Sequence, residues 1–159
     1  MPDHARFRGA AGDAPEFTDL GPSDWSLTFD TETLTDASQR LRIGTYQVRR
    51  GEGLVQAGVF LDPEVLTPFE IETVHQHADA RGWRVRTLTD FVDDVFYPLA
   101  LELGGLVIRS DLPFDISRLA IAHGPAKSPG GRMRGGFSFR LSDNPKHPPV
   151  QVKRIGARA

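Results

Sequence analysis

The sequence predicts an α/β domain with a mixed sheet and helices packed on it. Strand-like periodicity occurs at three places before residue 62, and helical periodicity with capping signals follows between residues 68 and 103. Composition is near the average of globular proteins, with 39% hydrophobic and 25% charged residues. At 159 residues, the chain has the size of one ordinary domain.

The first half of the predicted sheet is an antiparallel hairpin preceded by one strand. Residues 1–24 are rich in Gly, Pro, Ala and Asp without periodicity, so they are expected to form a disordered lead-in. The first strand is predicted at Trp25–Asp30. Strands at 42–49 and 54–61 flank the turn residues 50–53 and should pair with each other.

Two helices are predicted next. Thr67, Pro68 and Glu70 mark the start of a helix that ends near Arg81, because Gly82 follows. A second helix should begin at Thr87, since Thr87 and Asp90 have the spacing of a capping box. Its apolar residues recur every four positions, at Phe91, Val95, Leu99 and Leu103. Pro98 interrupts this pattern and predicts a bend or break around residues 96–99.

The C-terminal third begins with a strand followed by a helix. Leu106–Ile108 is short and apolar, which favours a buried strand, and a helix opens near Asp111. Beyond His123 a Gly-rich loop precedes two predicted strands, at 136–141 and 150–155. The expected organisation is therefore a lead-in over 1–24, a core over 25–123, and a basic, loop-rich tail with a β-hairpin over 124–159.

Composition excludes several kinds of site. The chain has no cysteine, so disulfides, thiolate zinc sites and a cysteine nucleophile are excluded. No stretch approaches about 18 apolar residues, and the N-terminus lacks the apolar core of a secretory signal. We therefore expect a cytoplasmic protein with no membrane partner.

Charge is distributed unevenly along the chain. Residues 1–116 carry 10 Lys and Arg against 20 Asp and Glu, whereas residues 117–159 carry 9 against the single Asp143. Such a basic segment fits a nucleic-acid-binding surface, because Lys and Arg neutralise phosphates. A solubilising tail explains the same charge equally well.

Two places carry candidate chemistry. Asp30 and Glu32 are two residues apart on the first strand, so both point to one face and can converge on a hard cation such as Mg²⁺ or Mn²⁺. Asp115 lies in the first turn of the helix that opens near Asp111. Taken singly, the strand pair also fits solvated carboxylates, and Asp115 also fits a favourable interaction with the helix dipole.

The order of these motifs resembles the DEDD exonuclease group of the ribonuclease H-like superfamily. FDTET at the end of the first strand matches the family's first motif, with Asp30 and Glu32, and SDLPFDISRLA matches its second, with Asp115 after Phe114. The resemblance covers Trp25 to Ala122. It implies a ribonuclease H-like mixed sheet with flanking helices.

The chain departs from the family in two respects. Asp111 stands where many members have Asn, and the third motif, a Tyr or His followed by a final Asp, is missing. Asp143 is the only later carboxylate, His147 follows it, and the last tyrosine is Tyr97. Relative to the family, the fold is expected to be incomplete at its C-terminus.

The resemblance implies a nucleic-acid-processing hydrolase, a 3′–5′ exonuclease that uses two Mg²⁺ or Mn²⁺ ions. Asp30 would bridge the ions, and Glu32 and Asp115 would complete their shells. Leu34 would wedge against the terminal base of a DNA or RNA 3′ end, although it also fits a core leucine. Without a third motif, weak or no activity is expected for the chain alone.

The main alternative is a non-catalytic remnant of such a domain, which binds nucleic acid or docks on a protein, or is one part of a larger polypeptide. Lys127, Arg132 and Arg134 in the Gly-rich loop are candidates for contacts with a phosphate backbone, although the loop also fits a mobile connector. His75 and His77 face apart on a helix, which disfavours joint metal ligation.

Overall fold

The computed structural model describes residues 23–109, 111–127 and 129–153, so nearly all of the predicted lead-in lies outside the described residues. The chain divides into two compact units, residues 1–110 and 111–159, and each is described by itself. The boundary that the sequence analysis placed after residue 123 stays a prediction.

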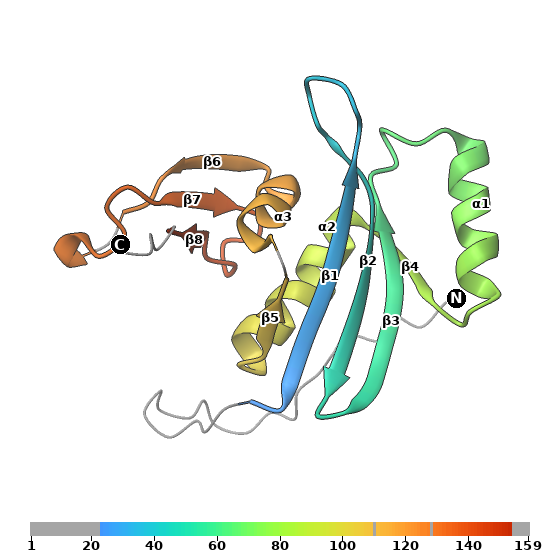
Figure 1. Cartoon of the computed structure of the whole chain (residues 1–159), viewed down its shortest axis with the longest axis horizontal. Helices are drawn as coiled ribbons and strands as arrows, with labels where there is room; N and C mark the ends of the chain where they lie inside the picture. The colour runs from blue at the N-terminus through green and yellow to red at the C-terminus, as the bar shows by residue number, and fades with distance from the viewer. Residues whose placement is uncertain (1–22, 110, 128, 154–159) are drawn as a thin grey trace, which may run out of the picture. The chain divides into compact units, whose positions relative to one another are not determined.

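The first unit contains a five-stranded mixed sheet, which confirms the α/β class (Figure 1). Its strands are β1 (Trp25–Thr33), β2 (Leu41–Arg50), β3 (Gly53–Leu61), β4 (Arg84–Thr87) and β5 (Leu106–Ile108), in the order β4-β3-β2-β1-β5. Strands β1, β2 and β3 are antiparallel neighbours, as the hairpin signal predicted. β5 is parallel to β1 and β4 is parallel to β3; the sequence analysis did not predict β4.

Helix α1 (Pro68–Asp79) begins where the sequence placed it. The backbone N–H of Glu70 donates to Thr67 Oγ1 at 3.3 Å, and Glu70 Oε2 accepts from the Thr67 N–H at 2.8 Å. This capping box satisfies two N–H groups that the first helical turn leaves without partners. The helix ends two residues before the predicted Arg81, and Gly82 then turns the chain with a φ of 65° toward β4.

A continuous helical segment follows β4 but differs from the expected helix. It comprises α2 (Leu88–Phe91) and two π-helical stretches, Val92–Phe96 and Pro98–Glu102. The predicted break near Pro98 is wrong, because Tyr97 keeps helical dihedrals of −68° and −44°. Pro98 lacks an N–H group and is the first residue of the second π-helical stretch. In this stretch the Leu103 N–H donates to Pro98 O, five residues earlier, at 3.1 Å.

The core of the first unit lies between the sheet and this helical segment. Phe29, Tyr46 and Phe60 project from three adjacent strands and are at most 2% exposed. The Phe60 ring stacks on Phe91 with centroids 4.0 Å apart. The expectation of a buried β5 is wrong: Leu106 is 62% exposed, because β5 is an edge strand and its register aligns Leu106 with Ser26 on the opposite face.

The second unit contains α3 (Leu112–Leu119) and a three-stranded antiparallel sheet of β6 (Ala122–Pro125), β7 (Phe137–Arg140) and β8 (Val150–Val152), in the order β6-β7-β8. The predicted helix and the predicted strand at 136–141 are confirmed. The strand predicted at 150–155 is confirmed over β8, and residues 154–155 lie outside the described residues. β6 lies where the sequence predicted the end of the helix and a loop. A short 3-10 turn, Pro129–Gly131, lies between β6 and β7. No helix in the described part of the chain is long and apolar enough to cross a bilayer.

Candidate functional site

Asp30 and Glu32 lie on one face of β1, as the strand period predicted. Both side chains are exposed. Phe29, which precedes Asp30, and Thr31, which lies between Asp30 and Glu32, are buried on the other face. Across the antiparallel pair, Asp30 lies opposite Thr45 of β2. This face of β1 and β2 is therefore polar and open to solvent.

Arg109 forms an ion pair with Asp30. The parallel pairing of β5 with β1 aligns Ile108 with Thr28, so the chain leaves β5 at the level where Asp30 projects from β1. The Arg109 side chain is 21% exposed and that of Asp30 is 51% exposed. The sequence analysis missed this partner, which is 79 residues away and carries no local signal.

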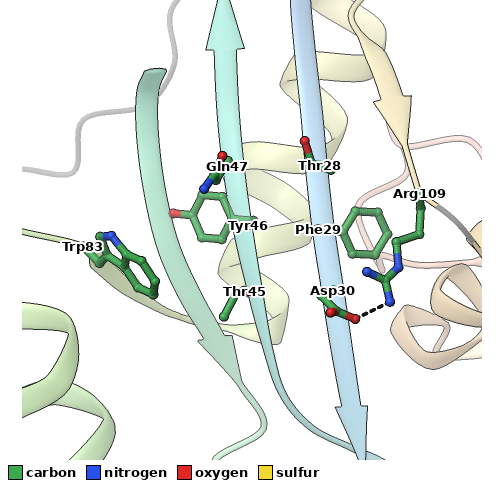
Figure 2. A pocket seen from close by; sticks show the side chains of 8 residues that line it. All are labelled: Thr28, Phe29, Asp30, Thr45, Tyr46, Gln47, Trp83 and Arg109. Carbon is green, nitrogen blue, oxygen red and sulfur yellow. Dashed lines mark hydrogen bonds and ion pairs between the residues drawn. The ribbon is translucent and has the colours of Figure 1, made fainter. Parts of the chain in front are cut away.

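A pocket of about 290 Å³ crosses this open face (Figure 2). Trp83 and Arg109 lie at its two ends, and β3, β2 and β1 run between them in Figure 2. The side chains between these ends on the open face are polar: Thr28, Asp30, Thr45 and Gln47. The pocket therefore combines an aromatic end, a polar floor and an end where Arg109 pairs with Asp30.

The Trp83 ring is fixed by its neighbours on the turn before β4. Its backbone N–H donates to Ala78 O at 2.9 Å, and the Arg81 guanidinium lies 5.7 Å from the ring centroid. His77 meets the ring edge-on with a centroid separation of 6.3 Å. Trp83 is half-buried and lines the pocket, although no sequence motif singled it out.

Tyr46 borders the pocket from the buried side of the sheet. Burial raises the pKa of its hydroxyl, although Arg86 Nε donates to that oxygen at 3.1 Å and acts in the opposite direction. The phenol is therefore protonated at neutral pH, where its oxygen accepts the hydrogen bond from Arg86.

The residues present do not form a ready site for a divalent cation in the first unit. Mg²⁺ and Mn²⁺ prefer several oxygen ligands, and Asp30 and Glu32 supply two carboxylates. However, Arg109 already neutralises Asp30. Within the described residues, no three His, Asp or Glu side chains form a group that could hold a metal ion.

Asp115 lies in the second unit, in the first turn of α3, and is 1% exposed. Its backbone N–H donates to Asp111 O at 3.2 Å. Asp111 occupies the N-cap position, with no side-chain capping bond. The roles that the resemblance implies for Asp115 and Asp111 stay predictions.

The remaining candidates are mostly on the surface. Leu34 is half-buried in the turn after β1, where its N–H donates to Arg40 O at 2.9 Å. Lys127, Arg132 and Arg134 are all exposed in the segment between β6 and β7. Of the two helix histidines, His75 is exposed and has no ring contact among the described residues, and His77 meets Trp83 edge-on.

Comparison with known proteins adds no further assignment, since no protein-family model, curated protein or solved structure matches this chain.

Proposed function

We propose that this chain is a ribonuclease H-like domain of the exonuclease type that binds single-stranded nucleic acid and does not cleave it alone. The observation that carries the proposal is the pocket with Trp83 at one end and Arg109 at the other. An aromatic ring stacks on any exposed base, and a guanidinium pairs with phosphate, which is how single strands are bound without sequence preference. A duplex buries its base faces, so it offers nothing for Trp83 to stack on.

The strand order supports the ribonuclease H-like part of the proposal. β1 lies inside the sheet with antiparallel β2 on one side and parallel β5 on the other, and it carries Asp30 and Glu32. This is the placement that the motif resemblance implies for an acidic pair on a central strand.

The ion pair supports a binding domain over an enzyme. A guanidinium beside Asp30 repels a second cation and occupies carboxylate oxygen that a metal ion would need. Glu32 alone makes no hydrogen bond or ion pair with the described residues and cannot hold a hard cation by itself.

A metal-dependent 3′–5′ exonuclease is the second candidate. It is favoured by one observation: Asp30 and Glu32 are exposed on the same face of β1, open to a phosphate and to solvent ions. In that case Mg²⁺ or Mn²⁺ would require Arg109 to leave Asp30.

The test measures binding and cleavage in the same samples. Fluorescence anisotropy with labelled single-stranded DNA and RNA gives Kd with Mg²⁺, with Mn²⁺ and with a chelator, and gels of the same mixtures report loss of 3′ nucleotides. We expect binding that survives chelation, with no cleavage. Trp83→Leu should weaken binding roughly 5- to 150-fold, the range for loss of one base stack, whereas Trp83→Phe should restore most of it.

Arg109→Gln removes the guanidinium that is proposed to pair with phosphate. Arg50→Gln is its matched control, because Arg50 is also ion-paired, with Asp24 at 2.9 Å, but lies outside the pocket. Metal-dependent loss of 3′ nucleotides that Asp30→Ala abolishes would establish the enzyme instead. Absence of binding to both DNA and RNA would overturn the proposed function.

A further inference from the structure

A second concave surface lies on the three-stranded sheet of the second unit. It is a groove of about 440 Å³ bordered by β6, β7 and β8, together with Lys127 and Pro149 from the adjoining loops. The function proposed above does not use this groove.

Small side chains form the floor of the groove. The register places Gly124 opposite Ser138, and Ser138 opposite Gln151, so these three residues share one face. A Cβ atom added at Gly124 would meet nothing within 4 Å, which shows open space above the strand at this point. Arg140 is two residues beyond Ser138 on the same strand and therefore faces the same side.

Hydrogen-bond donors border this space. Among the described residues, the Lys127 ammonium and the Ser138 hydroxyl have no hydrogen-bond or ion-pair partner. Gln151 Nε2 donates to Lys127 O at 2.9 Å, which ties the loop bearing Lys127 to β8. Arg140 Nη1 pairs with Asp143 at 2.5 Å, and the Asp143 side chain is 85% exposed.

The part of the sequence that forms the groove carries an excess of positive charge, which favours an anion, and Lys127 and Arg140 line the groove itself. Asp143 is the only acidic residue between residues 117 and 153, against seven Lys and Arg. An exposed pair such as Arg140–Asp143 is worth little, so phosphate oxygens can replace or join that carboxylate at low cost.

We propose that this groove binds the phosphodiester backbone of single-stranded nucleic acid through Lys127, Ser138 and Arg140. The inference rests on the proposed function and extends it, because it assigns the second unit a sequence-independent backbone contact. Arg is suited to this role since its planar donors match phosphate oxygens, and Lys supplies a point charge.

The experiment uses the full chain and labelled single-stranded DNA. Gly124→Val fills the groove floor with a strand-favouring side chain in space that is open, and we expect affinity to fall about tenfold. Gly53→Val is the control, because a Cβ at Gly53 makes only ordinary contact, 3.5 Å from Arg50 O, in the first unit. Circular dichroism and the unfolding midpoint verify that each variant is folded.

A second variant, Lys127→Gln, removes a charge without filling the groove. Lys127→Gln should reduce the slope of log K against log salt by about 0.7, the value for one lost phosphate contact on a single strand. Lys146→Gln, an exposed lysine outside the groove, should leave the slope unchanged.

Three outcomes separate the two proposals. Weakening by Trp83→Leu but not by Gly124→Val or Lys127→Gln would overturn the groove and leave the first proposal standing. Weaker binding by Gly124→Val and Lys127→Gln, but not by Trp83→Leu, would support the groove and count against the pocket of the first unit. A wild-type chain that binds no single strand would overturn both.

Discussion

At the residue scale, the ion pair of Asp30 with Arg109 is the main contact of the acidic motif on β1. The two side chains are 51% and 21% exposed, and partly exposed ion pairs typically contribute about 0–1 kcal/mol to folding. Stability is therefore a minor effect of this contact. Its larger consequence is electrostatic, because the guanidinium keeps other cations away from the only carboxylate of the motif that lines the pocket.

We expect Arg109→Gln to expose Asp30 to divalent ions. Removal of a positive charge at ion-pair distance lowers the repulsion by about 1–4 kcal/mol, so Mn²⁺ affinity should rise at least about fivefold. Electron paramagnetic resonance of free Mn²⁺ measures this affinity, with Arg50→Gln as control. Asp30→Asn in the Arg109→Gln background should reverse the gain; an unchanged affinity in Arg109→Gln would show that Arg109 does not exclude ions.

The two tyrosines give a second prediction at this scale. Burial raises the pKa of both Tyr46 and Tyr97, and they are the only tyrosines in the chain. Both phenols should therefore be less than half ionised in the folded protein at pH 10, where free tyrosine is half ionised. An absorbance titration at 295 nm should show ionisation midpoints above that pH in the folded protein, and a midpoint near pH 10 in denaturant.

The raised pKa values of the two tyrosines also make the free energy of unfolding depend on pH. The folded state holds these protons more tightly than the unfolded state, so the stabilisation is complete below pH 10 and is lost as pH rises through the higher folded-state pKa. A tyrosine that ionises near pH 10 while the protein remains folded would contradict this prediction.

At the element scale, a glycine on β3 leaves room for an aromatic ring from the neighbouring strand. A Cβ at Gly58 would meet the Tyr46 ring at 2.7 Å and Arg84 O at 2.5 Å. Gly58 therefore permits both the parallel pairing of β3 with β4 and the position of Tyr46. The aromatic cluster and the unpredicted edge strand depend on the same small residue.

We expect Gly58→Ala to lower the free energy of unfolding by about 1–3 kcal/mol, because the added methyl group overpacks this contact. Urea denaturation followed by tryptophan fluorescence measures the change. Gly53→Ala on the same strand is the control and should alter stability by less than about 0.5 kcal/mol. Equal effects at the two glycines would refute the steric explanation.

At the scale of the whole molecule, the two units differ in how their backbones are held. β1, β2 and β3 are nine or ten residues long and pair along their full length, whereas the strands of the second unit are three or four residues long. The largest buried aromatic cluster also belongs to the first unit. Local opening should therefore cost more in the first unit.

Hydrogen exchange should follow this difference. We expect the slowest backbone amides in β1–β3 and exchange at least tenfold faster in β6–β8, since local opening free energies track buried packing and ladder length. Exchange measured by mass spectrometry on peptic fragments resolves the two units. Equal protection in both sheets would mean that the units open together.

The sequence by itself determined the features that act over a few residues. Alternation placed Asp30 and Glu32 on one face, the Thr67–Glu70 spacing set the start of α1, and turn residues set the β2–β3 hairpin. These features depend on local dihedral preferences and neighbouring hydrogen bonds, which the order of residues specifies directly. The sequence also showed the uneven distribution of charge between the two ends of the chain.

Only the tertiary structure decided what those residues meet. Arg109 reaches Asp30 because β5 pairs in parallel with β1, and Trp83 reaches the same pocket because a turn after α1 leads into β4. The edge strands β4 and β6 are four residues long, too short for periodicity to distinguish them from loops. The pairing of strands in a sheet depends on long-range packing. The sequence therefore predicted the positions of Asp30 and Glu32 on β1, whereas the tertiary structure determined that Arg109 lies beside Asp30.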